Sequence, residues 1–148
     1  MSAVLTPDRP LSPTAWRIGH VALGLFVLGA ALVWFVDERA REYAALALSV
    51  YAAMVVSFLG GIHWGIGFSQ AAAPHPHFGW GAVPPVLAWV AVMMPAHAGL
   101  VLDAVMLLVC YMVDRKVYPA LGLTRWLTLR FRISVGAAVC CFLGAAGV

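Results

Sequence analysis

The stretch Tyr43–Phe68, YAALALSVYAAMVVSFLGGIHWGIGF, contains no Asp, Glu, Lys or Arg and is the longest continuous apolar run in the chain. An α-helix needs about 20 predominantly apolar residues to span the hydrocarbon core of a bilayer. The stretch therefore predicts a transmembrane helix that is long enough to tilt or to protrude from the bilayer.

The composition of the whole chain agrees with this prediction. Of the 148 residues, 64% are hydrophobic and only 10% are charged, which a water-soluble core of this size does not accommodate. The net charge of +3 gives no indication of nucleic-acid binding, because Lys and Arg in a membrane protein mainly report its orientation. The three cysteines, Cys110, Cys140 and Cys141, all lie in apolar runs, so no disulfide framework is expected.

Outward from Tyr43–Phe68, four further apolar segments predict an all-α, polytopic membrane helix bundle formed by a single domain of residues 1–148. Residues 1–15 form a polar tail, and the five transmembrane helices are expected at about 16–36, 43–68, 78–94, 98–113 and 131–148. The helices at 78–94 and 98–113 are short and read as a hairpin broken at Pro95, and one of them could be re-entrant instead of spanning.

The distribution of positive charge predicts the orientation of the five helices. With five spans, seven of the nine Lys and Arg residues fall on the side of the amino terminus, and only Arg39 and Arg41 fall on the other. The positive-inside rule then places the amino terminus inside and the carboxyl terminus outside.

The run Ser57–Gly65 is the most unusual part of the longest helix. Ser57, Gly60, Gly61 and Trp64 share one helical face, and small residues on such a face let a neighbouring helix approach closely. Helix packing is the favoured interpretation. The alternative is a flat slot in which a ring-shaped ligand is bound, and its predicted residues are Gly60, Gly61, His63, Trp64 and Trp89.

Two histidines lie at a similar depth on the first two predicted helices. His20 and His63 could be axial ligands of a haem or a metal, because an imidazole in an apolar helix needs a hydrogen-bond partner or a ligand. The chain has no recognisable metal-ligand spacing, so no metal site is predicted and a hydrogen-bonded His63 is favoured.

Asp103 is the only carboxylate well inside an apolar helix, and inserting it in charged form would cost at least about 2.5 kcal/mol. It must be neutral, paired or beside water. The predicted depths of Asp103 and His63 differ too much for a direct pair. A structural hydrogen bond to a neighbouring helix is favoured over a proton relay through Asp103.

Polar residues accumulate at the predicted inner surface. An ion pair of Asp114 with Arg130 or Arg132 would connect the fourth and fifth helices. Anchoring by long basic side chains explains most of this charge. The alternative is a basic pocket for an anionic lipid headgroup or a phosphate-bearing ligand.

The Ser57–Gly65 run, Pro84 and Pro85 with Trp89, then Asp114 and Trp126 through Arg130, resemble domain-of-unknown-function family 3429 (DUF3429), which is similar to eukaryotic transmembrane protein 69. The resemblance covers most of the chain. It implies a small multi-pass protein of a bacterial inner membrane or a mitochondrial membrane, and it carries no established activity.

The sequence contains no nucleophile elbow, phosphate-binding glycine loop or paired catalytic carboxylates, so a non-enzymatic protein is predicted. The leading hypothesis is an accessory, assembly or oligomerising subunit of the bacterial inner membrane, in contact with lipids and with a larger complex or its own copies. The alternatives are a carrier or sensor for a quinone, tetrapyrrole or lipid between the second and third helices, and a proton-coupled transporter that uses Asp103. The sequence names no cofactor.

Overall fold

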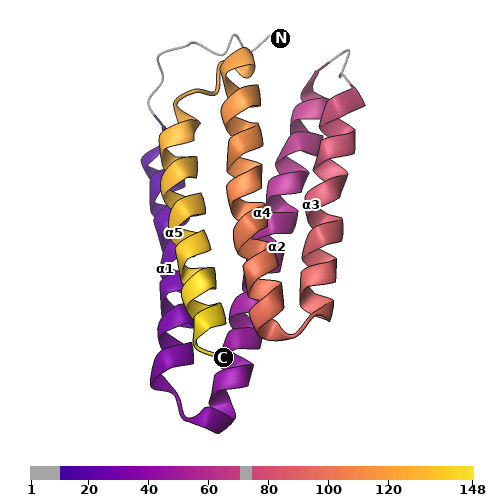
Figure 1. Cartoon of the computed structure of the whole chain (residues 1–148). Helices are drawn as coiled ribbons and strands as arrows, with labels where there is room; N and C mark the ends of the chain where they lie inside the picture. The colour runs from indigo at the N-terminus through magenta and orange to yellow at the C-terminus, as the bar shows by residue number, and fades with distance from the viewer. Residues whose placement is uncertain (1–10, 71–74) are drawn as a thin grey trace.

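The computed structural model describes residues 11–70 and 75–148, and nearly all of them lie in helices (Figure 1). Five α-helices are joined by short connections, with a 3-10 helix η1 (Tyr118–Leu121) before the last of them. Their bounds are Pro13–Phe35 for α1, Glu38–Ser69 for α2, His75–Met93 for α3, Ala96–Val117 for α4 and Trp126–Ala146 for α5. Residues 1–10 of the predicted polar tail, with Arg9, and residues 71–74 lie outside the described part.

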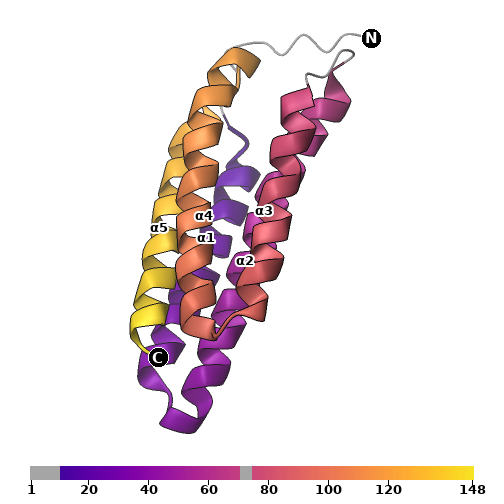
Figure 2. The ribbon, with the colours of Figure 1, turned by 45° about the vertical axis from the view of Figure 1, so that its right-hand side comes forward.

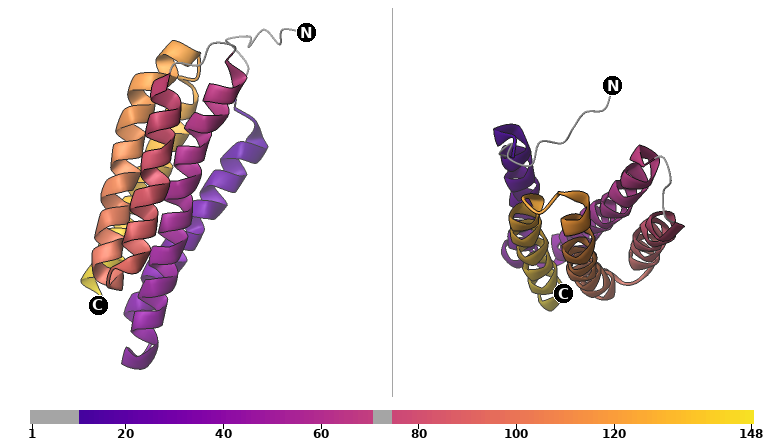
Figure 3. Two further views of the ribbon diagram at one scale, coloured as in Figure 1. Left: turned by 90° about the vertical axis from the view of Figure 1, so that its right-hand side faces the viewer. Right: turned by 90° about the horizontal axis from the view of Figure 1, so that it is seen from above.

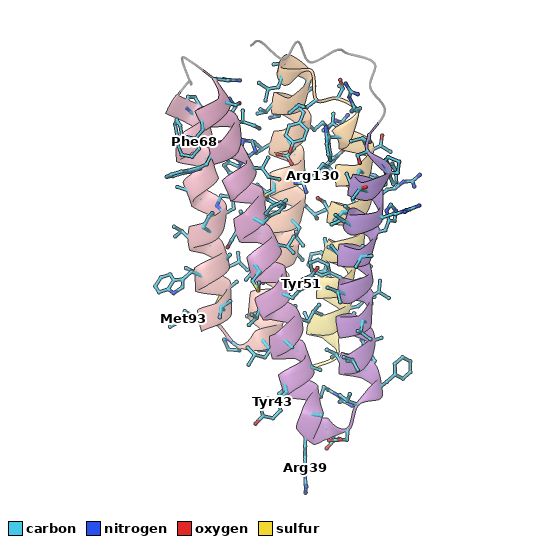
Figure 4. All side chains as sticks on the ribbon, turned by 180° about the vertical axis from the view of Figure 1, so that it is seen from behind. Arg39, Tyr43, Tyr51, Phe68, Met93 and Arg130 are labelled. Carbon is cyan, nitrogen blue, oxygen red and sulfur yellow. The ribbon has the colours of Figure 1, made fainter. Side chains whose placement is uncertain are left out.

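Successive helices run in opposite directions, so α1 starts at one end of the bundle and the chain ends at the other (Figures 1 and 2). α1, α2, α4 and α5 form a ring in which each helix packs against the next, and α3 packs only against α2 and α4 (Figure 3). Figure 4 labels a residue near each end, Arg130 and Arg39, and we call the two ends of the bundle by these names.

Polar and conformationally special residues stand where the helices begin and end. Asp37 caps α2, because its side chain accepts hydrogen bonds from the backbone N–H groups of Arg39 and Ala40 at 2.9 and 3.1 Å. Pro95 precedes α4 and prevents α3 from continuing. Gly122 adopts φ 69°, a left-handed conformation that a glycine tolerates best, and thereby ends η1.

Four helices of the described chain are long and apolar enough to cross a membrane: α1, α2, α4 extended through η1, and α5. α3 is not one of them, since its first turn carries two histidines and one proline and its middle carries Pro84 and Pro85. The apolar side chains of the four helices are exposed to a large extent, as in a bundle surrounded by lipid. The predicted all-α membrane bundle is confirmed at this level.

Three of the predicted helix boundaries were placed too far from the true ends. The charged residues after Phe35 form the first turn of α2, not a loop up to Tyr43. α4 continues past residue 113 to Val117, and α5 begins at Trp126 instead of residue 131. Charged residues were read as marking connections, but here they continue helices beyond the apolar core, because a helix satisfies its own backbone whatever side chains it carries.

Candidate functional site

Asp114 lies at the centre of a buried polar cluster at the Arg130 end. One oxygen, Oδ1, accepts a hydrogen bond from Nε2 of His63 at 2.9 Å, and the other, Oδ2, accepts from Nε of Arg130 at 2.8 Å and also from its Nη2. The three side chains come from α2, α4 and α5, and none of them is more than about one tenth exposed. The cluster therefore connects three helices through one carboxylate.

The extended helices are the reason that this cluster forms. Asp114 lies in the last turn of α4 and Arg130 in the second turn of α5, so the segment predicted as a polar connection is helical at both ends. A helix fixes the direction of a side chain, whereas a loop would have left both groups free to reach water. Of the two predicted partners of Asp114, the structure gives Arg130.

Three further side chains surround the cluster. Tyr118 of η1 hydrogen-bonds with Asp114 and Arg130. The ring of His63 stacks on the ring of His77 of α3, with their centroids 5.9 Å apart. The ring of Trp80 is nearly perpendicular to that of His63, with their centroids 6.5 Å apart. The cluster and its neighbours thus include residues of α2, α3, α4, η1 and α5, but none of α1.

The hydrogen bonds define what the cluster can do chemically. A carboxylate oxygen accepts hydrogen bonds, so Nε2 of His63 is assigned as the nitrogen that donates to Asp114. A buried charge costs several kcal/mol unless it is paired and hydrogen-bonded, and here both oxygens of Asp114 are used. The arrangement fixes helices and orients an imidazole, but it leaves no free oxygen of Asp114 for a ligand.

Gly60 brings α2 and α3 into backbone contact. A β-carbon at Gly60 would lie 2.5 Å from the carbonyl oxygen of Gly81, and one at Gly81 would lie 2.8 Å from the carbonyl oxygen of Gly60. Pro85 has no N–H group to donate to the Gly81 carbonyl within α3, so that oxygen is left facing α2. The same β-carbon at Gly60 would meet Pro84 and Pro85 at 3.3 and 2.8 Å. Gly60 of α2 and the two prolines of α3 therefore pack together at a point where these two helices approach closely.

The five residues predicted to line a ligand slot do not share one cavity. Gly60 is covered by α3, and His63 faces Asp114 in the interior. Gly61 faces outward with open space beside it. Trp64 donates its indole N–H to the carbonyl of Phe78 at 3.1 Å, and Trp89 is 65% exposed. Gly60 and Gly61 therefore lie on different sides of α2: Gly60 packs against α3, and Gly61 faces the outside of the bundle.

Trp89 instead lines an open apolar groove between α2 and α3. The groove has a volume of about 580 Å³ and faces outward. Its remaining lining residues are Val50, Ala53, Met54, Ser57, Phe58, Pro85, Ala88 and Val92. A second, smaller groove of about 220 Å³ lies between α1 and α2.

His20 and Arg132 belong to the outer surface, not to the buried cluster. His20 is exposed, stacks on Trp16 and hydrogen-bonds through Nδ1 with the carbonyl of Trp16 at 2.8 Å. Arg132 lies over the ring of Trp16 at 5.4 Å. The exposed His20 and the buried His63 thus do not form the pair of axial histidines that was considered as an alternative, and His63 is hydrogen-bonded, as the favoured interpretation predicted. Within the described residues, no group of three or more His, Cys, Asp or Glu side chains could hold a metal ion.

Asp103 is separate from this cluster, as the difference in depth predicted. Its side chain is fully buried, and Oδ2 accepts a hydrogen bond from Ser49 of α2 at 3.5 Å, while Oδ1 has no partner among the described residues. A β-carbon at Gly99, one turn before Asp103, would lie 2.4 Å from the carbonyl oxygen of Ala91 and 2.9 Å from Oγ of Ser49. Three helices are therefore in close contact beside Asp103.

Four of the residues that matter were not singled out in the sequence: His77, Gly81, Gly99 and Tyr118. Gly81 could have been found, because it lies four residues before Pro85 and its carbonyl loses its helical donor there. Gly99 could have been found from its position four residues before Asp103. His77 and Tyr118 carry no such signal, since only the fold brings them to His63 and Asp114.

Comparison with known proteins identifies the family. A family model described as "Protein of unknown function (DUF3429)" matches residues 11–146, which is nearly the whole chain. The match includes the three residues of the buried cluster and both glycines of the α2–α3 crossing. Searches of curated proteins and of solved structures gave no match. The chain belongs to the DUF3429 family of proteins of unknown function.

Proposed function

We propose that this protein is a non-enzymatic multi-pass membrane protein that acts by packing against other membrane helices, as an accessory or assembly subunit or as a homo-oligomer. The observation that carries the proposal is the outward face of α2. Gly61 and Gly65, one turn apart, are both exposed, and a β-carbon at either position would meet nothing within 4 Å. The space beside Gly60 and Gly67 of the same helix is already occupied, by α3 at Gly60 and by the ring of Phe78 at Gly67.

Small residues have a particular meaning on a membrane-facing helix. Lipid tails are as apolar as leucine, so burial of apolar surface does not drive helices together, and close van der Waals contact between backbones does. A pair of glycines at i and i+4 permits that contact. Two glycines that the fold itself does not use therefore favour a second helix, from another subunit or another copy, on this face.

In this proposal all five helices cross the bacterial inner membrane, with the Arg130 end inside. The 19 residues of α3 would extend over about 28 Å, close to the thickness of a bilayer core, and α3 runs alongside α2 and α4 (Figure 2). The positive charge also favours this orientation. Among the described residues, Arg39 and Arg41 are at the Arg39 end, and the other Arg and Lys side chains belong to helix ends at the opposite side.

Reporter fusions test the topology directly. A periplasm-dependent phosphatase fused after Val148 or within the Met93–Ala96 turn should be active, whereas fusions after Ser69 or Leu121 should be inactive. An active phosphatase after Leu121 would contradict a five-span arrangement with the amino terminus inside.

The glycine face gives the first testable prediction. The double variant Gly61→Leu, Gly65→Leu should lose the oligomer or the co-purifying complex, because two leucine side chains keep a second backbone from approaching. Native mass spectrometry of protein purified in mild detergent measures this directly. Gly24→Leu is the matched control, since Gly24 on α1 is equally open and should change nothing. A wild-type protein that is only a monomer without partners would overturn the proposal.

The groove lined by Trp89 favours a second candidate, a carrier or sensor for a hydrophobic small molecule. Its volume lies within the usual range of ligand sites, and Met54, Phe58 and Trp89 offer flexible and aromatic surface with Ser57 as a polar contact. A quinone, a tetrapyrrole or a lipid chain would suit this lining. The site differs from the slot predicted from sequence, because neither His63 nor Trp64 lines it.

If the groove binds such a molecule, Trp89→Ala should reduce the amount bound at least several-fold, because an aromatic side chain at a binding site contributes much of its contact area. Absorbance spectra and extraction of bound lipids from the purified protein give the measurement. Trp34 of α1 is a comparably exposed tryptophan that lines neither groove, so Trp34→Ala should leave the bound amount unchanged. Equal binding in the wild-type protein and in Trp89→Ala would contradict the carrier function.

A further inference from the structure

Asp103 has a position that no packing function explains. Its side chain is completely buried, about 10 Å along α4 from the Arg39 end and about 21 Å from the opposite end of the helix. Its one hydrogen bond, from Ser49, is long at 3.5 Å, and Oδ1 has no partner among the described residues. An apolar residue would fill this place at lower cost.

Within residues 11–70 and 75–148, no cation forms an ion pair with Asp103. From α2 comes the hydroxyl of Ser49, and from α5 the thiol of Cys141 lies close enough to interact electrostatically. α3 packs the backbone of Ala91 against Gly99, one turn before Asp103. Among the described residues, the buried ion pairs to His63 and Arg130 belong to Asp114 and not to Asp103.

An ionised carboxylate in such surroundings would be buried without a paired cation, at a cost of at least about 2.5 kcal/mol. Protonation removes the charge and turns one oxygen into a donor. The hydroxyl oxygen of Ser49 on α2 lies 3.5 Å from Oδ2 and can then act as an acceptor as well as a donor. A neutral carboxylic acid therefore fits the site, and a carboxylate does not.

We propose that Asp103 is a proton-binding site in the core of the bundle, which holds an exchangeable proton at neutral pH. On release, the O–H bond of the carboxylic acid breaks and the proton passes to a water molecule, and uptake reverses this step. The end of α4 that is nearer to Asp103 is the one at the Arg39 end of the bundle. Because the charged form has no partner inside, deprotonation must loosen the contact of α2 and α4 at Ser49, so proton binding and helix packing are coupled.

Infrared spectroscopy of the full-length protein in phosphatidylcholine bilayers tests the proposal. At neutral pH the wild-type protein should show the carbonyl stretch of a protonated carboxylic acid, and this band should be lost in Asp103→Asn. Asp37→Asn is the matched control, because Asp37 lies at the exposed start of α2 and should leave the band in place. Transfer to D₂O should shift the band, because the proton exchanges.

A second variant keeps the proposal testable if Asp103→Asn does not fold. Ser49→Ala removes the one hydrogen bond to the carboxyl group and should shift the band without abolishing it. Absence of the band at neutral pH in the wild-type protein would overturn the proposal. A band that does not shift in D₂O would also overturn it. A band that appears only when sodium is replaced by choline would overturn it as well, because Asp103 would then be a ligand of a monovalent cation.

Discussion

Replacing Asp114 with alanine is expected to destabilise the bundle by about 3–5 kcal/mol, the cost of leaving buried charge without its partner. Arg130 would lose both of its hydrogen bonds to Oδ2, and His63 would lose its bond to Oδ1. Both side chains are about nine tenths buried or more, so water does not replace the carboxylate without opening the helices. Unfolding in mixed detergent micelles, followed by tryptophan fluorescence, measures the loss.

Two comparisons make this prediction specific. Arg132→Ala removes a cation of α5 that lies over an aromatic ring and not in the buried cluster, and should cost no more than about 1 kcal/mol. The double variant Asp114→Leu, Arg130→Met should be more stable than Asp114→Ala, since apolar groups of similar volume replace a buried ion pair at little cost. Equal stability of Asp114→Ala and wild-type protein would show that the cluster does not hold the helices together.

Two adjacent glycines should respond in opposite directions to the same substitution. Gly60→Ala places a methyl group 2.5 Å from the backbone oxygen of Gly81, and because a backbone cannot rotate away, α2 and α3 must separate. A loss at the upper end of the usual 1–3 kcal/mol range for overpacking, about 3 kcal/mol, is expected. Within a single monomer, Gly61→Ala meets open space and should stabilise α2 by up to about 1 kcal/mol through its helix propensity.

The same unfolding measurement decides between the two outcomes, and cysteine cross-linking between α2 and α3 reports whether they separate. Gly81→Ala should behave like Gly60→Ala, because its methyl group would meet the indole ring of Trp64 and the carbonyl of Gly60. If Gly60→Ala and Gly61→Ala were equally stable, the close approach of α2 and α3 at this point would be wrong.

The number and order of the helices could be predicted from the sequence, since long apolar runs separated by polar or proline-containing segments leave few alternatives. The ends of α4 and α5 could not. Asp114 and Arg130 were read as parts of a connection because they are charged, although a helix continues as long as its backbone hydrogen bonds are made. Because these helix ends were missed, the sequence predicted an ion pair of Asp114 with either Arg130 or Arg132 and did not distinguish between them.

The partner of His63 shows the same limit more clearly. An imidazole in an apolar helix needs a hydrogen-bond acceptor, and the sequence alone indicated that one must exist. It did not indicate Asp114, 51 residues away, because nothing local relates the two positions. The separation of Asp103 from His63, in contrast, followed from counting residues along two helices and agrees with the structure.

The amino-acid sequence was sufficient to predict a helical membrane protein of the DUF3429 family with polar groups in its apolar interior, because bilayer thickness and helical rise convert apolar length into spans. Which faces of those helices meet became known from the three-dimensional structure. It placed Gly60 on a packed side and Gly61 on an open one, and it joined His63, Asp114 and Arg130 while leaving Asp103 without a cation. Side-chain partners depend on how helices rotate and cross, and that is fixed by packing between segments far apart in the chain.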